Sequence, residues 1–275
     1  MAEAVPAAAA ARQRGGRHGG AVSRGLRAAH RRGTGRLRAA AVHGGGAGGD
    51  RAVRIPIARE GMPFVVVCVV LAIGTLLWAR HGGWGVRTVA PAVFGIVALF
   101  VLYFFRDPER TAPPGEDVVV SPADGRVMSV GPVAGEDFMG GTATRVTIFL
   151  SVFNVHVQRA PVAGGVDHYS YRAGQYLAAW REEASSNNER ASLGIQTRGG
   201  PVLVRQIAGL VARRIVTYPR EGDRVARGDR IGLIRFGSRV DLFLPPDWPV
   251  TVAPGDVVRG GETPVARMVP SEEPS

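Results

Sequence analysis

Hydrophobic and polar positions divide the chain into three zones. The first fifty residues contain almost no large apolar side chain, and two charge-free apolar runs follow at 63–79 and 89–105. Each run has 17 residues, which makes about 25 Å of helix and is at the short end for crossing a bilayer. Because only RHGGWGVRT separates the runs, the pattern predicts a transmembrane helical hairpin over 61–106.

Over 107–275 the pattern changes to short segments bounded by Gly, Pro and Asp, which is typical of strands. One helical piece is expected near 175–184, leading into the polar loop SSNNER. The predicted fold class is therefore mostly β, a small barrel or sandwich that follows the helical hairpin. The expected strands are Val118–Ser121, Arg126–Val130, Arg145–Val152, Val202–Ile207, Arg213–Tyr218 and Ile231–Phe236.

An internal repeat and one irregularity occur in this β zone. GDRVARGD at 222–229 is echoed by GDVVRGGE at 255–262, which indicates two matching turn-and-strand units. The irregularity lies in RIGLIRFGSRVDLFLP at 230–245, whose apolar spacing is that of strands. Gly237 and Ser238 interrupt this spacing, although a glycine weakens a sheet. Packing alone gives no reason for a Gly-Ser pair there.

The charge of the chain is concentrated at its start. Residues 1–60 are predicted to be disordered, because a zone rich in Ala, Gly and Arg cannot bury enough apolar surface. The first fifty residues hold nine arginines against Glu3 and Asp50, which supplies +7 of the net +11. No interleaved aromatic residues and no recognisable nucleic-acid-binding module accompany this charge. Anionic lipid is therefore favoured over nucleic acid as the partner of the tail.

The same charge predicts the orientation of the hairpin. Arginines precede the first apolar run, and Arg106 and Arg110 follow the second, so the positive-inside bias places both termini and the β domain on the cytoplasmic side. The alternative is a helical hairpin buried inside a soluble fold. A cleaved signal peptide is disfavoured, because about sixty residues precede the first run and no small-residue cleavage site follows it.

The residue types that are missing exclude several kinds of chemistry. All 34 basic residues are arginine, so the chain has no lysine. Enzymes that need a lysine amine are excluded, including pyridoxal-phosphate enzymes, lysine aldolases, and biotin or lipoyl carriers. The one cysteine, Cys68, lies in the first apolar run, so no disulfide forms within the chain and a cysteine nucleophile is not expected.

Three polar residues of the β domain are candidates for catalysis. If Ser238 is a nucleophile, His156 is a better candidate for its base than His168, because it ends an apolar strand. Asp124, in VVSPADGRV, occupies a turn from which a carboxylate can orient the imidazole. Each also has a plain structural interpretation, in which Asp124 caps a turn, His156 is a core histidine and Ser238 fills space. The spacing alone leaves both interpretations open.

A larger set of blocks resembles one known family. Over about 104–245 the chain contains, in order, FFRDPER, VVSPADGRV, FLSVFNVHVQRAPVAG, SSNNER, VRQIAGLVARRIV and FGSRVDLFLP. Together these blocks are similar to phosphatidylserine decarboxylase, in particular to its short bacterial and archaeal form. Several blocks that agree in order are far more specific than a lone Gly-Ser pair.

The resemblance implies an inactive proenzyme that cuts itself between Gly237 and Ser238. In the family scheme Asp124 orients His156, His156 takes the proton of Ser238, and the serine oxygen attacks the Gly237 carbonyl. Elimination and hydrolysis then leave a pyruvoyl group, the expected cofactor, at the start of a 38-residue small chain. Glycine suits position 237, because a residue without Cβ leaves its carbonyl open to attack.

The resemblance also implies the reaction. The pyruvoyl ketone would form a Schiff base with the amine of phosphatidylserine, which yields phosphatidylethanolamine and CO2 in phospholipid biosynthesis at the cell membrane. His156 is the expected proton donor after cleavage, and no metal is needed. The implied partners are phosphatidylserine in the bilayer and the large and small chains of one proenzyme. A homodimer is compatible with the sequence.

The chain departs from the family pattern at a few positions. Asn154 stands where some relatives have Asp, and Arg159 stands where the long bacterial and mitochondrial members have a second histidine. Four arginines are candidates for contacts with the substrate headgroup, and the role of Asn187, Asn188 and Glu189 in the NNER block is unassigned. These arginines are Arg159, Arg190, Arg205 and Arg239.

Three other classes of protein share some of these features. A membrane-anchored serine hydrolase would keep the Ser238 hydroxyl intact. A non-enzymatic barrel that binds lipid or a partner protein would remain a single chain. A pyruvoyl decarboxylase of a soluble amino acid would share the chemistry, and the apolar hairpin is the main argument against that class.

Overall fold

The computed structural model describes residues 56–80, 86–134, 137–175, 187–209, 214–235 and 238–270. The predicted disordered tail lies outside this part of the chain except for residues 56–60. The helical piece predicted near 175–184 lies outside it except for Gln175, and Gly237 also lies outside the described residues. The outcome of these predictions is therefore not tested.

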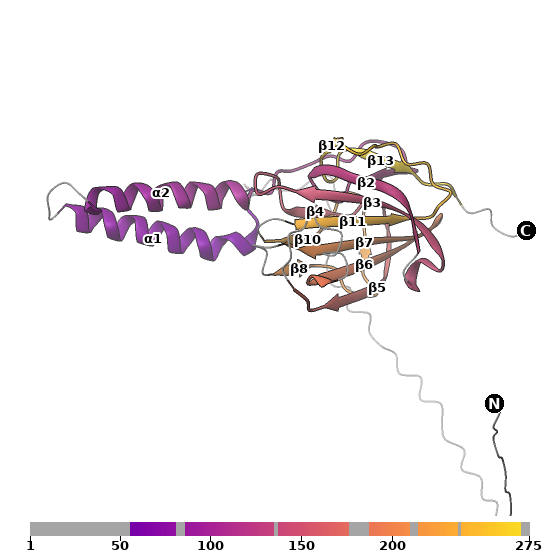
Figure 1. Cartoon of the computed structure of the whole chain (residues 1–275), viewed down its shortest axis with the longest axis horizontal. Helices are drawn as coiled ribbons and strands as arrows, with labels where there is room; N and C mark the ends of the chain where they lie inside the picture. Colours follow the sequence, from indigo (N-terminus) through magenta and orange to yellow (C-terminus); the bar gives the residue numbers. More distant parts are fainter. Residues whose placement is uncertain are drawn as a thin grey trace, which may run out of the picture. The chain divides into compact units, whose positions relative to one another are not determined.

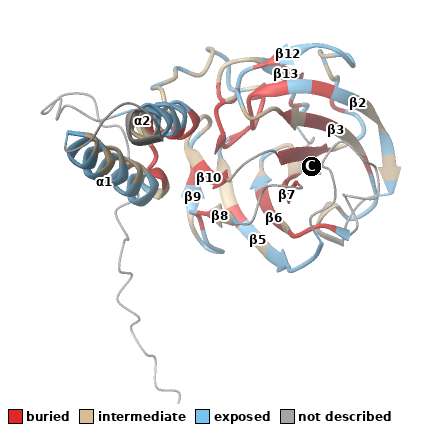
Figure 2. Cartoon of the chain, turned by 60° about the vertical axis from the view of Figure 1, so that its left-hand side comes forward, coloured by how far each residue is buried: buried red, intermediate tan, exposed pale blue. Residues whose placement is uncertain are grey.

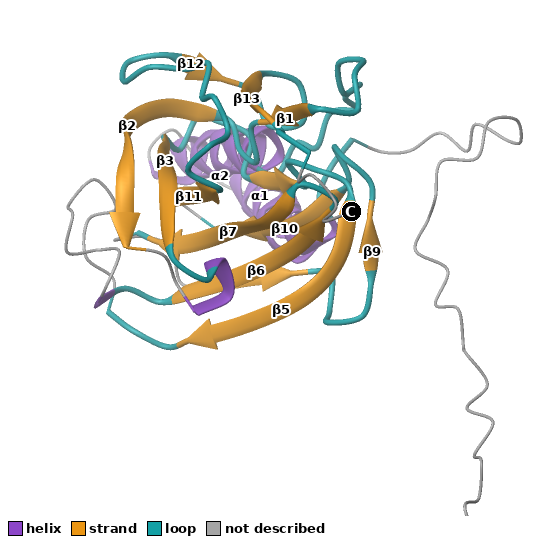
Figure 3. Cartoon of the chain, turned by 90° about the vertical axis from the view of Figure 1, so that its right-hand side faces the viewer, coloured by secondary structure: helices purple, strands orange, loops and turns teal. Residues whose placement is uncertain are grey.

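Eight strands form one antiparallel sheet that curls round a core (Figure 1, Figure 3). Its strand order is β12-β2-β3-β11-β7-β6-β5-β9, so β11, from near the C-terminus, lies in the middle between β3 and β7. The strands are β2 (Gly125–Ala134), β3 (Thr142–Leu150), β5 (Gly164–Arg172), β6 (Arg190–Thr197), β7 (Gly200–Ala208), β9 (Arg224–Val225), β11 (Ser238–Leu244) and β12 (Val257–Val258).

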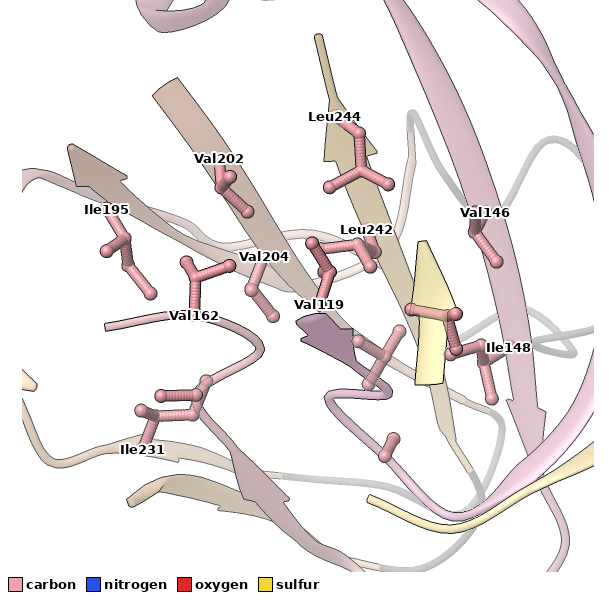
Figure 4. Close-up of a cluster of buried hydrophobic side chains, with 14 of the residues drawn as sticks. Val119, Val146, Ile148, Val162, Ile195, Val202, Val204, Ile231, Leu242 and Leu244 are labelled. Atoms are coloured by element: carbon pink, nitrogen blue, oxygen red, sulfur yellow. The ribbon is translucent and has the colours of Figure 1, made fainter. Parts of the chain in front are cut away.

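Two smaller sheets pack against the same core. One has the order β4-β10-β8 and the other pairs β1 with β13. Figure 4 shows Val119 of β1 and Ile231 of β10 among side chains from the main sheet, such as Val204 and Leu242. The main sheet therefore buries one face against these strands. Their bounds are β1 (Val118–Val120), β4 (Val157–Arg159), β8 (Ile215–Thr217), β10 (Arg230–Ile234) and β13 (Pro264–Arg267).

The internal repeat forms the two edges of the main sheet. β9 pairs with β5 at one edge, and β12 pairs with β2 at the other. In each repeat the first glycine has a positive φ, 90° at Gly222 and 101° at Gly255, which glycine adopts without strain. The next residue, Asp223 or Asp256, accepts a hydrogen bond from the backbone N–H three residues earlier. The prediction of two matching turn-and-strand units is confirmed.

Both apolar runs are helical. The 3-10 turn η1 (Arg59–Gly61) leads into α1 (Met62–Ala79), and α2 (Val86–Phe104) follows. No residue of α1 is buried, and Figure 2 colours most residues of these helices as exposed or intermediate. This exposure argues against a hairpin buried inside a soluble fold. By length and composition the segment 59–79 can cross a membrane, whereas the apolar part of α2 is shorter, so the transmembrane hairpin stays a prediction.

The ends of the two helices meet the β domain through backbone and apolar contacts. The Ala58 N–H donates to the Phe105 carbonyl at 2.7 Å, and Phe104 and Phe105 are fully buried. These two aromatic rings belong to a cluster with Val155, just before β4, and Leu233 of β10. The FFRDPER block is therefore the junction between the helices and the strands that carry His156.

The strand predictions have mixed outcomes. All six expected strands are present with shifted ends, whereas β4, β5, β6 and β13 were not predicted. In β5 only Val166 is buried, because most of its side chains are polar or partly exposed, so the strand lacks the apolar alternation that marks a half-buried strand. One short 3-10 turn, η2 (Asp137–Met139), lies before β3.

A comparison of two glycines in β2 tests the close packing of the sheet. A Cβ at Gly125 would lie 2.2 Å from the Phe149 carbonyl oxygen, whereas a Cβ at Gly131 would have no atom within 4 Å. We expect Gly125→Ala to lower the free energy of unfolding by about 1–3 kcal/mol and Gly131→Ala to change it by less than about 0.5 kcal/mol. Urea unfolding in detergent measures both, and equal midpoints for the two variants would contradict the described packing.

Candidate active site

Ser238 lies inside the main sheet rather than in an exposed loop. It is the first residue of β11 and is paired with Leu150 of β3 and Ala208 of β7. Its side chain is fully buried, and its Oγ has no hydrogen-bond partner among the described residues. An unsatisfied buried hydroxyl costs about 1–3 kcal/mol and needs an explanation. Reactivity of this oxygen is one such explanation.

His156 is held in a defined tautomer by a backbone carbonyl. It follows β3 and precedes β4, it is fully buried, and its ring lies 4.2 Å from the Phe104 ring between centroids. Its Nδ1 is 2.9 Å from the Asn154 carbonyl oxygen. Because that oxygen can only accept, we assign the proton to Nδ1. The other nitrogen, Nε2, is then a bare acceptor, and no group in the described part of the chain donates to it.

The turn that supplies this carbonyl is itself fixed by hydrogen bonds. The Asn154 side-chain oxygen accepts from the Ser151 N–H at 2.9 Å and from the Ser151 hydroxyl at 2.8 Å. Burial lowers the pKa of His156 to about 4, against an opposing effect of the Asn154 carbonyl. The imidazole is therefore neutral at pH 7, with its lone pair on Nε2, which is the form a general base requires.

A chain of buried amides connects His156 to the strand beside Ser238. Gln158 donates to the His156 carbonyl at 2.7 Å, and Gln206 donates to Gln158 at 2.8 Å. Gln206 is paired with Val240, one inward-facing position along β7 from the Ala208–Ser238 pair. The Ile234 N–H also donates to the His156 carbonyl, four residues before Ser238. His156 and Ser238 thus lie at the same end of the sheet.

A glycine makes room for this amide chain. A Cβ at Gly232 would lie 2.7 Å from the Gln206 side-chain nitrogen and 2.3 Å from the Val216 carbonyl oxygen. Thr217 closes the chain by donating its hydroxyl proton to Gln206 at 2.9 Å. Every amide in this buried group therefore has a partner, which makes its geometry specific.

Asp124 contacts an arginine and a backbone N–H. Arg110 donates to both carboxylate oxygens, at 2.6 and 2.8 Å, and the Gly260 N–H donates to Oδ1 at 2.8 Å. Among the described residues the ring of His156 is held by the Asn154 carbonyl and not by Asp124. Asp124 reaches His156 through charge, since its carboxylate raises the pKa of His156 in opposition to burial.

The arginines considered for the headgroup are largely engaged in the fold. Arg159 pairs with Asp107 at 3.1 Å and donates to the Pro108 carbonyl, and Arg239 makes two bonds to the buried Asp241. Arg205 donates to a serine on β6, and its guanidinium lies over an aromatic ring of β11. Arg190 begins β6 and is partly exposed. These contacts account for Arg159, Arg205 and Arg239 without a ligand.

The NNER block lies on the far side of Ala208 from Ser238. Asn188 donates its side-chain amide to the Ala208 carbonyl at 2.7 Å. The Ala208 N–H donates to the Glu189 carbonyl at 2.9 Å. Sequence reasoning assigned no role to this block, nor to the Asn154 carbonyl or Arg110. The presence of Arg110 in the FFRDPER block could have pointed to it. The role of a backbone carbonyl cannot be inferred from a sequence, because every residue has one.

Comparison with known proteins agrees with the resemblance of the sequence blocks. A family model described as phosphatidylserine decarboxylase matches residues 97–266, more than half of the chain. The chain is similar to proteins named phosphatidylserine decarboxylase proenzyme. The protein of this name from Symbiobacterium thermophilum is 53% identical over 77% of this chain and 95% of that protein. The one from Geobacter sulfurreducens is 47% identical over 76% of this chain and 94% of that protein. A third, from Desulfotalea psychrophila, is 41% identical over 78% and 98%. The chain therefore belongs to the phosphatidylserine decarboxylase family.

Proposed function

We propose that this chain is a membrane-associated proenzyme that cuts itself between Gly237 and Ser238 and then decarboxylates phosphatidylserine to phosphatidylethanolamine. One observation supports the proposal most. A neutral imidazole and a serine are both buried at one end of the same sheet, and within the described residues neither Nε2 of the imidazole nor Oγ of the serine has a hydrogen-bond partner. In a folded protein such atoms are usually hydrogen-bonded, and a nucleophile with its base is a recognised exception.

The proposed cleavage uses groups of the chain alone. Nε2 of His156 accepts the Ser238 hydroxyl proton, and Oγ attacks the carbonyl carbon of Gly237 to form an ester in place of the amide. Removal of the Ser238 Cα proton expels the Gly237 carboxylate, and the resulting dehydroalanine adds water and loses ammonia. The products are a large chain that ends at Gly237 and a small chain that begins with a pyruvoyl group.

The surroundings of His156 suit this proton transfer. The Asn154 carbonyl fixes the ring through Nδ1, as the carboxylate does in a serine protease triad. Asp124 contributes charge that favours the imidazolium formed in the step. The pyruvoyl ketone would supply an electron sink for loss of CO2, a role that no lysine-bound cofactor can take in this chain. His156 then serves as the proton donor.

The proposed location follows from the helices. We assign 61–106 to a membrane hairpin and 107–275 to the catalytic domain, with the Arg-rich residues 1–60 and the catalytic domain on the cytoplasmic side. The exposed apolar surface of α1 and the junction of Phe104 with His156 support this assignment. A lipid headgroup at the interface would then meet the domain at the end of the sheet that holds Ser238.

Mass spectrometry of the purified protein tests the cleavage. We expect the wild-type chain to give a 38-residue fragment covering 238–275 with a pyruvoyl start, and Ser238→Ala to remain one chain, because it lacks the attacking oxygen. Ser170→Ala, at an exposed serine of β5, is the matched control and should be processed normally. An intact wild-type chain, or fragmentation of Ser238→Ala, would refute the proposal, and an intact chain labelled by a fluorophosphonate would favour a serine hydrolase.

The pH dependence of cleavage tests the role of His156. Because burial lowers its pKa to about 4, only about a tenth of the imidazole is protonated at pH 5. We expect newly synthesised precursor to process at pH 5 within about twofold of its rate at pH 7.5. A rate that falls by half near pH 6.5 would contradict a buried base.

The same lowered pKa sets the acid limit of this measurement. The unfolded chain binds the His156 proton near pH 6.5, whereas the folded chain binds it only near pH 4. The stability that depends on the neutral imidazole is therefore complete above pH 6.5 and is lost as the pH falls toward 4. Precursor samples should therefore be checked for folding at pH 5 by circular dichroism.

Release of labelled CO2 tests the substrate. Processed protein in lipid vesicles should release the label from phosphatidylserine that carries it in the serine carboxyl group. Free serine is the comparison, because a decarboxylase of a soluble amino acid would prefer it. Fully processed protein that releases no label from the lipid would exclude the assigned substrate while leaving the cleavage intact.

A further inference from the structure

One buried carboxylate near Ser238 has an oxygen without a hydrogen-bond partner in the part of the chain that the structure describes. Among the described residues, Nε2 of His156, Oγ of Ser238 and Oε2 of Glu189 are buried near this end of the main sheet without a hydrogen bond, as is Nε of Arg235, three residues before Ser238. The proposed self-cleavage uses the first two and leaves Glu189 without a role. Glu189 is only 4% exposed, so solvation by bulk water does not explain its free oxygen.

The strand register aligns Glu189 with Ser238. Ser238 is paired with Ala208, and the Ala208 N–H donates to the carbonyl of Glu189, the residue before β6, so the three residues form one row across β11, β7 and the segment that leads into β6. Directly paired residues lie on the same face of a sheet. This face is the core face, because Val240 and Leu193, further along the same strands, belong to the main core. Ser238 and Glu189 are about 10 Å apart along the backbone row, with Ala208 between them in that row.

The charge of Glu189 distinguishes it from the other buried carboxylates of the domain. Asp124 and Asp241 each pair with an arginine at 2.6 and 2.7 Å. Among the described residues no ion pair involves Glu189, and its other oxygen accepts a hydrogen bond from the Tyr171 hydroxyl at 3.1 Å. A buried carboxylate without a cation is costly, so the position is suited to a cation that arrives with a ligand.

We propose that Glu189 binds the ammonium group of the serine headgroup beside residue 238. This inference rests on the proposed function, in which the substrate amine must reach the atom that Ser238 becomes. The ammonium is the one positive charge of phosphatidylserine. Transfer of one of its protons to Oε2 would convert the ammonium to a neutral amine and the carboxylate to a carboxylic acid, so the amine gains the lone pair that it needs as a nucleophile.

Three neighbouring arginines lie on the other face of the sheet from Glu189, and the guanidinium of a fourth, Arg235, lies over the Phe64 ring of α1 at 5.3 Å. Arg190 and Arg239 directly follow Glu189 and Ser238 in their strands, so the alternation of a strand directs them to the opposite face. Arg239 pairs there with Asp241, and Arg205 donates to Ser192 on the same outer face. Glu189 therefore lies on the core face of the sheet, whereas Arg190, Arg205 and Arg239 lie on the outer face.

The test compares processing with substrate use in Glu189→Gln. This variant keeps the size of the side chain and removes its charge. We expect normal self-cleavage, a KM for phosphatidylserine in mixed micelles raised about ten- to hundredfold, and less lipid attached to the small chain after reduction with cyanoborohydride, measured by mass. Glu116→Gln, at an exposed glutamate outside the site, is the matched control and should leave all three measurements unchanged.

The outcomes separate this inference from the proposed function. Normal processing with unchanged KM and trapping in Glu189→Gln would overturn the inference alone, and so would failure of that folded variant to cleave, since Glu189 would then serve cleavage. If Glu189→Gln does not fold, Glu189→Asp takes its place, with a raised KM expected and an unchanged KM contradicting the inference. A wild-type chain that neither cleaves nor releases CO2 would instead overturn the proposed function.

Discussion

The backbone ladder that runs from β3 through β11 and β7 to the start of β6 determines where the groups of the candidate site lie. Ser238 begins the central strand of this ladder, and its seven residues are all buried. Leu150 ends β3 just before the turn that carries His156, and Ala208 connects Ser238 to Glu189. A shift of one residue in this register would turn Ser238 away from the core face. The register of the strands therefore determines which side chains of the candidate site lie close together.

Much of the fold can be predicted from the local spacing of apolar residues. The elements that were missed are those in which this spacing is irregular. The apolar runs, the repeat and six strands could be predicted because their spacing reports directly on burial. β5 and β6 were missed because Gly194 and the polar residues around His168 break their alternation. Their pairing with β7 and β9 is set by distant segments of the chain, which a window of a few residues cannot contain.

The candidate site divides in the same way. Ser238, Gly237, His156 and Asp124 could be named as candidates from motifs, because the expected chemistry requires a particular residue type at each position. The partner of the His156 ring is a main-chain oxygen, which any residue at position 154 would supply. The arginine that holds Asp124 lies fourteen residues earlier in the chain, and only the fold brings the two together. The sequence therefore identifies the candidate residues, whereas only the structure shows which groups hydrogen-bond to them.

Pairing of the last three strands has a consequence for how the protein would assemble. β11, β12 and β13 each pair with strands that precede residue 237, namely β3 and β7, β2, and β1. Before the proposed scission the protein folds as one unimolecular event, and afterwards the same ladders join two polypeptides. Once melted, the mature protein would have to reassociate from separate pieces at a rate that depends on concentration. The unimolecular folding of the chain would thus be possible only before cleavage.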